Sequence, residues 1–214
     1  MAVCCEEQYV HIAMELVTGK NLYNVLFPKF TSKEWILNED QQFKIGYQIS
    51  MALAFIHQHP AKILHRDIKP ENIMISADTK SVKLCDLGLG RIEELSSGLL
   101  KTLGKKKFPG SPFYMAPELF SQTGTSTQFS DVWALACSLS ELHTKKRCWE
   151  IKVIAELKMK MDSKQKPMTL KMPEFLQAVI DKSFSYDAQS RPTAKEILDT
   201  YVNYEKTKNN FAVS

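Results

Sequence analysis

The stretch His65-Arg66-Asp67-Ile68-Lys69-Pro70-Glu71-Asn72 decides how this sequence is interpreted. Asp67 and Asn72 stand five positions apart, so one short loop can present both side chains to the same cleft. A carboxylate there can accept a proton from an attacking hydroxyl, and an amide oxygen can hold a divalent cation. Lys69 can then offset negative charge that develops on a transferred group. The alternative is a charged surface turn, and eight positions that match one long pattern argue against it.

The composition describes an ordinary globular domain. With 214 residues, 44% of them hydrophobic and 24% charged, the chain is long enough to bury a sizeable core. A net charge of +4 gives no reason to expect a nucleic-acid or membrane partner, and no apolar run approaches the length of a bilayer. The five cysteines lack the spacing of a zinc site or a disulfide framework. We therefore expect a cytoplasmic or nuclear protein.

Apolar periodicity predicts a few strands followed by many helices, an α+β arrangement dominated by helix. Two short strands are expected within residues 3–17, and Gly19-Lys20-Asn21 is interpreted as a break after them. Further strands are expected at residues 73–76 and 81–85, a long loop at residues 86–118, and a polar, frayed tail at residues 206–214. Helices are expected at residues 22–27, from a capping box at Asn38 and Gln41 to about residue 59, and at residues 128–143, 152–161, 173–182 and 193–204.

Two more motifs follow the first in order. Asp86-Leu87-Gly88 ends an expected strand, where the Asp86 carboxylate could ligate a magnesium ion. The segment from Gly110 to Glu118 ends in Ala-Pro-Glu. With these three motifs the chain resembles the large lobe of a eukaryotic protein kinase of the serine/threonine type. The resemblance implies a partial kinase domain over residues 1–205, with a small-lobe remnant and hinge in residues 1–17 and the large lobe in residues 18–205.

The resemblance also implies the chemistry: transfer of the γ-phosphate of ATP, with Mg²⁺, to hydroxyl groups of protein substrates. In that assignment Asp67 is the base, Lys69 lies against the transferred phosphate, and Asn72 and Asp86 are the magnesium ligands. The preference for serine or threonine rests on Lys69 and on Ser111.

A nucleotide-binding edge is implied in the same way. Met14 resembles a gatekeeper, the backbone groups of Glu15 and Val17 would bind the adenine, and Met74 would pack beneath the ring. For Met14 and Met74, ordinary core methionines remain the alternative.

Other residues resemble supporting parts of a kinase. Asp131 would brace the catalytic loop from a central helix, and Glu118 would pair with Arg191. Arg66 beside Asp67 implies control by an activating kinase that phosphorylates the 86–118 segment. The candidate acceptors are Ser96, Ser97 and Thr102, for which polar loop residues are the alternative.

Two expected elements do not occur within residues 1–214: a Gly-rich loop over the phosphates and a lysine on the third strand. We therefore expect weak nucleotide binding by these residues alone, because positioning supplies most of phosphoryl-transfer catalysis. Two hypotheses stay open. The sequence is part of an active serine/threonine kinase, or it is a truncated, catalytically weak or dead kinase-like binding module.

Overall fold

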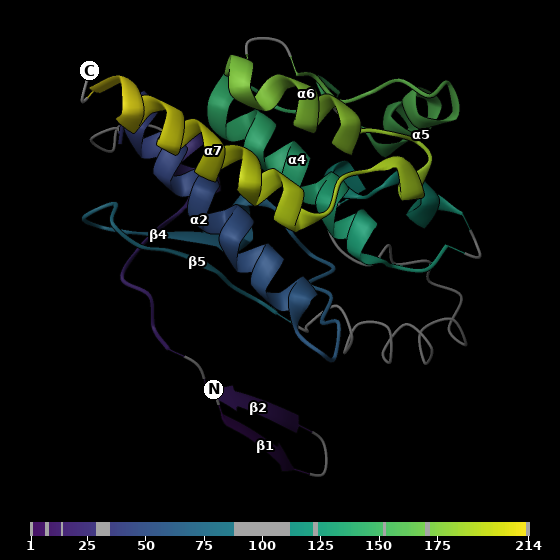
Figure 1. The fold of residues 1–214 in the computed structure, drawn as a ribbon. Coiled ribbons are helices and arrows are strands. Elements are labelled where there is room, and N and C mark those ends of the chain that lie inside the picture. Colours follow the sequence, from purple (N-terminus) through teal and green to yellow (C-terminus); the bar gives the residue numbers. More distant parts are fainter. Residues whose placement is uncertain are drawn as a thin grey trace.

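The computed structural model describes residues 2–6, 9–13, 15–28, 35–87, 112–121, 124–151, 153–169 and 172–212. Figure 1 shows a body of packed helices with a small sheet beside one of them and a separate hairpin at the N-terminus. Within the described part, this arrangement confirms the predicted α+β class dominated by helix.

The strands form two antiparallel sheets. β1 (Ala2–Glu6) and β2 (Tyr9–Ala13) pair with each other, which confirms the two strands predicted within residues 3–17. The second sheet has the order β3-β4-β5, made of β3 (Gly19–Asn21), β4 (Ile73–Ser76) and β5 (Val82–Leu84). The predictions of β4 and β5 are confirmed.

The predicted break at Gly19-Lys20-Asn21 is wrong, because these residues form β3 and pair with β4. Glycine is required there for packing: a Cβ on Gly19 would lie 1.9 Å from the carbonyl oxygen of Ile75. Glycine often indicates a turn, but here its lack of a side chain lets two backbones approach closely.

The helices follow the predicted pattern closely. α2 begins with the predicted capping box, in which the Asn38 side chain accepts from the Gln41 amide at 2.9 Å and the Gln41 side chain accepts from Asn38 at 3.0 Å. The helices are α1 (Leu22–Leu26), α2 (Glu39–Gln58), α4 (Gln128–Thr144), α5 (Ile154–Asp162), α6 (Glu174–Ser183) and α7 (Ala194–Ala212). Short 3₁₀ turns are η1 (Pro70–Asn72), η2 (Pro112–Tyr114), η3 (Pro117–Phe120) and η4 (Ala188–Ser190), so the end of the predicted 86–118 loop contains η2 and the start of η3.

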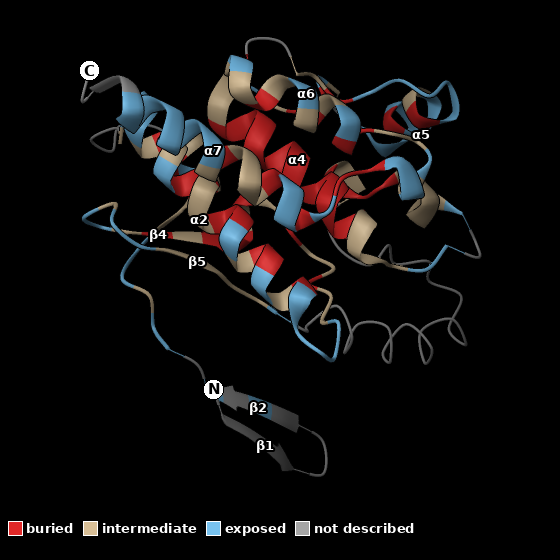
Figure 2. Cartoon of the chain, viewed as in Figure 1, coloured by how far each residue is buried: buried red, intermediate tan, exposed pale blue. Residues whose placement is uncertain are grey.

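α4 lies in the centre of the helical body. Every residue from 130 to 142 is buried, and Figure 2 shows α4 as a buried strip between exposed outer helices. Trp133 is fully buried and packs edge-on against Phe184 at a centroid distance of 5.1 Å. A helix that is apolar on nearly every side is buried in this way, as the sequence predicted.

α7 is longer than predicted. It runs to Ala212 and not to residue 204, so the expected frayed tail is helical through most of its length. Its first half packs along α2, where a Cβ on Gly46 would lie 2.1 Å from the Tyr201 hydroxyl oxygen. The apolar pattern ends near Tyr204 because the later residues face solvent, and periodicity cannot detect such a helix. Among the described helices, none is long and apolar enough to cross a membrane.

Candidate active site

His65 connects the loop after α2 to the end of β5. The ring is fully buried, and burial lowers the pKa of His65 although the Asp131, Asp67 and Asp86 carboxylates act against that effect. The Cys85 carbonyl can only accept, so His65 Nε2 donates to it at 2.9 Å. His65 Nδ1 then accepts from the backbone N–H of Asp67 at 3.4 Å. One neutral imidazole therefore fixes the backbone beside both Asp67 and Asp86.

Asp131 braces the same loop from α4, as predicted. Its Oδ2 accepts from the backbone N–H of His65 at 2.8 Å, and its Oδ1 accepts from that of Arg66 at 2.8 Å. His57 at the end of α2 also contacts Oδ2, with Nε2 at 2.9 Å. Arg66 has a positive φ of 70°, a conformation that non-glycine residues rarely adopt. The buried Asp131 carboxylate accepts from two consecutive backbone amides and so stabilises this backbone conformation.

Asp67, Lys69 and Asn72 meet at one carboxylate oxygen. Lys69 Nζ lies 2.7 Å from Asp67 Oδ2, and Asn72 Nδ2 donates to the same atom at 2.9 Å and to the Asp67 carbonyl at 2.8 Å. Because its amide nitrogen is used in this way, Asn72 has its side-chain oxygen left for another group. The structure thus brings together the three predicted catalytic residues, whose roles stay predictions.

Asp86 follows β5, and a backbone hydrogen bond of the preceding residue connects it to this cluster. The Cys85 N–H donates to the Asn72 carbonyl at 2.8 Å, and Asp86 itself has a positive φ of 63°. The two predicted ligands, an amide oxygen and a carboxylate, are of the hard oxygen type that Mg²⁺ prefers. Among the described residues no group of three or more His, Cys, Asp or Glu could hold a metal by itself.

The residues predicted to form a nucleotide edge lie on or just before the sheet of β3, β4 and β5. Lys83 on β5 forms an ion pair with Glu15, which ties the segment before β3 to the sheet. Lys83 is also the register partner of Met74 on β4, and directly paired residues point to the same face of a sheet. Glu15 and Met74 are therefore brought to one face, and Val17 follows as a half-buried residue before β3. Met14 lies outside the described residues.

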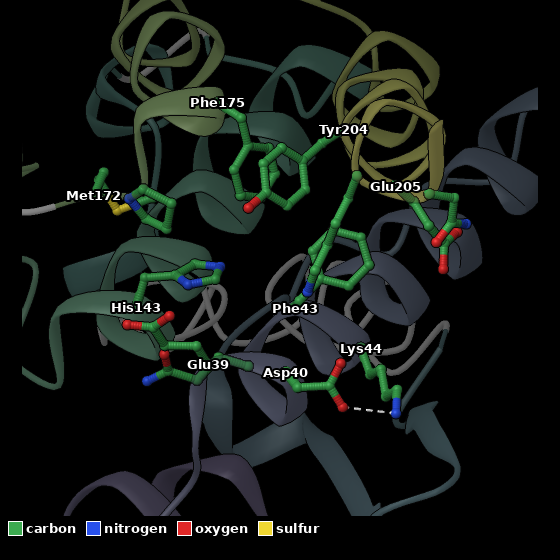
Figure 3. A pocket seen from close by; sticks show the side chains of 13 residues that line it. Glu39, Asp40, Phe43, Lys44, His143, Met172, Phe175, Tyr204 and Glu205 are labelled. Atoms are coloured by element: carbon green, nitrogen blue, oxygen red, sulfur yellow. Dashed lines mark ion pairs between the residues drawn. The ribbon is translucent and has the colours of Figure 1, made fainter. Parts of the chain in front are cut away.

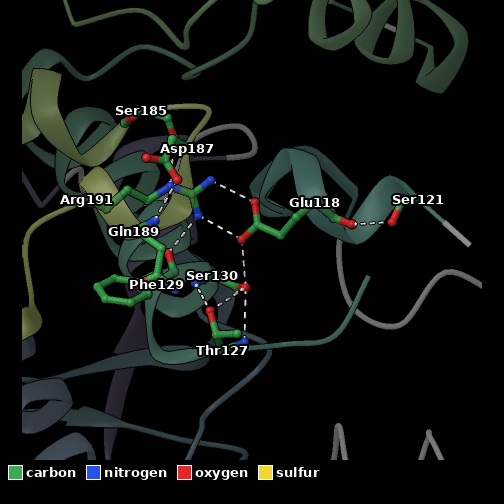
Figure 4. A network of polar contacts seen from close by, with 9 residues as sticks. All are labelled: Glu118, Ser121, Thr127, Phe129, Ser130, Ser185, Asp187, Gln189 and Arg191. Atoms are coloured by element: carbon green, nitrogen blue, oxygen red, sulfur yellow. Dashed lines mark hydrogen bonds and ion pairs between the residues drawn. The ribbon is translucent and has the colours of Figure 1, made fainter. Parts of the chain in front are cut away.

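Glu118 and Arg191 form the predicted pair (Figure 4). Arg191 donates through Nη1 to Oε1 at 2.8 Å and through Nη2 to Oε2 at 2.7 Å, and Ser130 donates to Oε1 at 2.8 Å. Burial alone would raise the pKa of Glu118, but the bonds and charge of Arg191 lower it below its usual value. The remaining Arg191 donors reach backbone carbonyls of Phe129 and Ser185.

Some contributing residues had no sequence signal. His57 is separated from Asp131 by 74 positions, and Lys83 is separated from Glu15 by 68. Only the tertiary fold brings such pairs together. The candidate phosphorylation sites Ser96, Ser97 and Thr102, and also Ser111, lie outside the described residues.

A cavity of about 470 Å³ lies away from this site, at the N-terminal end of α2 (Figure 3). Phe43, Phe175 and Tyr204 form its aromatic wall, and Phe175 stacks on Tyr204 at 4.0 Å. The 20 residues of α2 span about 30 Å, so this cavity and the catalytic loop stand at opposite ends of one helix. None of the residues that line it belongs to the catalytic loop.

Comparison with known proteins identifies the family of the chain. Residues 1–202 match the family described as the protein kinase domain. The chain is 33% identical over 190 residues to the mouse protein "Serine/threonine-protein kinase Nek4", which covers 88% of this chain and 22% of the relative. It is 32% identical over 191 residues to "Probable serine/threonine-protein kinase nek2" of Dictyostelium discoideum, covering 88% of this chain and 44% of the relative. The chain therefore spans less than half the length of these relatives.

Proposed function

This chain belongs to the protein kinase domain family, and we propose that it transfers the γ-phosphate of ATP to serine or threonine side chains of protein substrates. One observation carries the proposal: the side-chain nitrogens of Lys69 and Asn72 both lie within 3 Å of the same Asp67 carboxylate oxygen. A family resemblance places such residues in the same loop, and the structure adds that their side chains point toward one another.

In the proposed reaction Asp67 takes the proton of the attacking hydroxyl. Its Oδ2 is held by Lys69 and Asn72, so Oδ1 is the oxygen that can face the substrate. The Lys69 ammonium, fixed beside Asp67, is placed to offset negative charge on the transferred phosphoryl group. Mg²⁺, when held by Asn72 and Asp86, would supply neutralisation of the β- and γ-phosphate oxygens.

Nucleotide binding in this proposal uses the face built by β3, β4 and β5. The backbone of Glu15 and Val17 would bind the adenine, and Met74 would support the ring from β4. The Lys83–Glu15 ion pair supports this assignment, because it brings the segment that contains both backbone groups next to β5.

Three expectations remain predictions. They are activation by a kinase that acts on the 86–118 segment, a cytoplasmic or nuclear location, and the absence of nucleic-acid or membrane partners.

The deciding experiment measures phosphate transfer by residues 1–214 from labelled Mg·ATP to a library of serine and threonine peptides. Asp67→Asn should lower transfer by roughly 10²–10⁴-fold, the usual contribution of a positioned base. Asp162→Asn is the matched control, since that exposed carboxylate forms an ion pair with Lys158 on the same helix, and it should leave transfer unchanged.

Equal transfer by Asp67→Asn and the native chain would contradict the assigned role of Asp67. No transfer by a folded native chain that still binds partner proteins would instead favour the kinase-like binding module. The native chain in EDTA should also be inactive. Full activity in EDTA would contradict the assignment of Asn72 and Asp86 as metal ligands.

A further inference from the structure

The cavity of about 470 Å³ at the N-terminal end of α2 has the size of a small-molecule site (Figure 3). Ligand cavities in proteins span about 300–1,000 Å³ and combine apolar walls with a few polar groups. Four helices contribute to this one: α2, the end of α4, the start of α6 and the second half of α7. Its occupant is therefore decided by side chains that the proposed phosphate transfer does not use.

Three aromatic side chains, Phe43, Phe175 and Tyr204, form one wall of the cavity. Phe175 and Tyr204 stack at a centroid distance of 4.0 Å, and the Phe43 ring lies 5.8 Å from Tyr204 at an interplanar angle of 44°. Tyr204 stays 40% exposed although its ring takes part in this cluster. Aromatic rings favour further rings that stack on a face or meet an edge, so the wall suits a flat aromatic occupant.

His143 lines the cavity from α4, and Figure 3 shows its ring directed into it. The His143 Nε2 atom lies 3.2 Å from the hydroxyl oxygen of Tyr201, a fully buried residue. That hydroxyl has no other hydrogen-bond partner among the described residues, and buried donors in proteins are almost always satisfied. Tyr201 therefore donates to Nε2, and this nitrogen carries no proton.

The proton of the His143 ring then lies on Nδ1. Burial lowers the pKa of His143 to about 4, so the imidazole is neutral at neutral pH and has a single N–H. The Nδ1 atom has no hydrogen-bond partner among the described residues. The cavity thus offers one N–H donor beside an aromatic wall, and a fitting occupant must carry an acceptor.

The charged side chains around the cavity decide which acceptor fits. Asp40 and Lys44 pair at 2.7 Å and cancel, and Lys208 is the other ammonium group of the lining. Glu39 and Glu205 form no ion pair among the described residues. Carboxylates are therefore in excess, which disfavours an anionic ligand. An ammonium group cannot accept from the imidazole N–H, so a neutral acceptor such as a carbonyl remains.

We propose that this cavity binds a small neutral aromatic molecule that carries one hydrogen-bond acceptor, such as an aryl ketone or an aryl amide. The rings of the ligand pack on Phe43, Phe175 and Tyr204, and its carbonyl oxygen accepts from His143 Nδ1. Such a ligand binds whether or not the chain transfers phosphate, because the catalytic loop stands at the other end of α2.

The test titrates the full chain with three probes that share a naphthalene body. Acetylnaphthalene has a neutral acceptor, ethylnaphthalene has none, and naphthoate is an anion. Dissociation constants are measured from the methyl resonance of Met172, a buried residue of the same lining, so the signal reports binding at this site. The ketone should bind about three- to tenfold tighter than the hydrocarbon, the gain from one hydrogen bond, and also tighter than naphthoate.

Two substitutions separate the donor from the wall. His143→Phe keeps a ring and removes the N–H, so ketone and hydrocarbon should bind this variant equally. Tyr204→Ala removes part of the wall, and both probes should bind it roughly tenfold more weakly, the effect of one lost aromatic contact. Phe55→Ala is the matched control, since Phe55 is an exposed phenylalanine of α2 that does not line the cavity, and it should leave all three constants unchanged.

Equal binding of ketone and hydrocarbon by the native chain would overturn the proposal. So would the absence of binding, a preference for naphthoate, or native affinity in Tyr204→Ala. If His143→Phe does not fold, the nitrogen resonances of the imidazole in the native chain decide, because they report which nitrogen carries the proton. A proton on Nδ1 and a shift of that nitrogen on addition of the ketone are expected, and a proton on Nε2 would overturn the assignment of the donor.

Discussion

Asp131 and Glu118 are both held where α4 begins, yet they stabilise different parts of the molecule. The Asp131 oxygens accept two consecutive backbone amides of the catalytic loop, at His65 and Arg66. The Glu118 oxygens accept the guanidinium of Arg191, a side chain from the segment before α7. Asp131 thus fixes the backbone on which the catalytic side chains stand, whereas Glu118 fixes how two distant segments pack.

This difference predicts two kinds of failure. Loss of the partner of Glu118 leaves a largely buried carboxylate without its cation, so the cost falls on the free energy of unfolding. Loss of the Asp131 charge leaves two backbone amides poorly satisfied, so the cost falls first on the geometry of one loop. A variant that exchanges these two outcomes would contradict the assigned roles of Asp131 and Glu118.

The largest effect on stability is expected for Arg191→Ala. Breaking a buried ion pair by removing one partner costs about 3–5 kcal/mol, and the Arg191 side chain has no exposed surface. Urea unfolding should show this loss. The double variant Arg191→Met with Glu118→Met should be less destabilised than the single one, since no charge is left unpaired. If Arg191→Ala lowers the free energy of unfolding by only about 1 kcal/mol or less, the pair contributes no more than an exposed ion pair does.

His143 near the end of α4 is a third kind of case, a half-buried titratable side chain whose charged form is disfavoured by burial. Burial lowers the pKa of His143 from 6.5 to about 4, while its Nε2 lies 3.2 Å from the Tyr201 hydroxyl. The unfolded chain therefore takes up the proton first, and the free energy of unfolding should fall as the pH drops from 6.5 to about 4. At about 1.4 kcal/mol for each pH unit, the loss has an upper bound of about 3.5 kcal/mol.

The measurement is urea unfolding at a series of pH values for the native chain and His143→Gln. The variant should lose the His143 part of the slope between pH 6.5 and 4 and keep the contributions of other groups. Parallel curves for the two proteins would contradict the low pKa of His143.

The sequence predicted this architecture where local patterns were strong. The capping box at Asn38 and the apolar spacing of α2 and α4 are local, so both helices were found close to their true bounds. β3 was missed because a three-residue strand exists only through its pairing with β4. The last turns of α7 were missed because they have no apolar face.

The candidate site divides in the same way. Asp67, Lys69 and Asn72 lie within one loop, so a motif could identify them and the structure shows them converging. The contact of Arg147 with Tyr23 depends on segments far apart in the chain, and no motif contains both residues. Motifs therefore identified the residues proposed for the chemistry, and the fold was needed to find contacts between distant segments.

Asp131→Asn should have the smallest effect on stability and the most local one. Asparagine keeps the shape and one acceptor, but its amide nitrogen must face one of the N–H groups of His65 and Arg66. Leaving such a buried donor unsatisfied costs about 1–3 kcal/mol. Hydrogen exchange of these two amides should accelerate more than exchange in α4, a readout that requires no enzymatic activity. Phosphate transfer should fall further than stability does, by roughly 100-fold, because a displacement of about 1 Å in a catalytic loop has that effect.

Asp181→Asn is the control for the lost charge. Asp181 on α6 accepts from Thr169 at 3.0 Å and from Gln177 at 2.9 Å, and it has no contact with the catalytic loop. That variant should leave exchange at His65 and Arg66 unchanged. If Asp131→Asn instead unfolded the protein as strongly as Arg191→Ala, Asp131 would be a packing residue like Glu118. The distinction between a carboxylate that positions backbone and one that joins segments would then fail, because both would act through global stability alone.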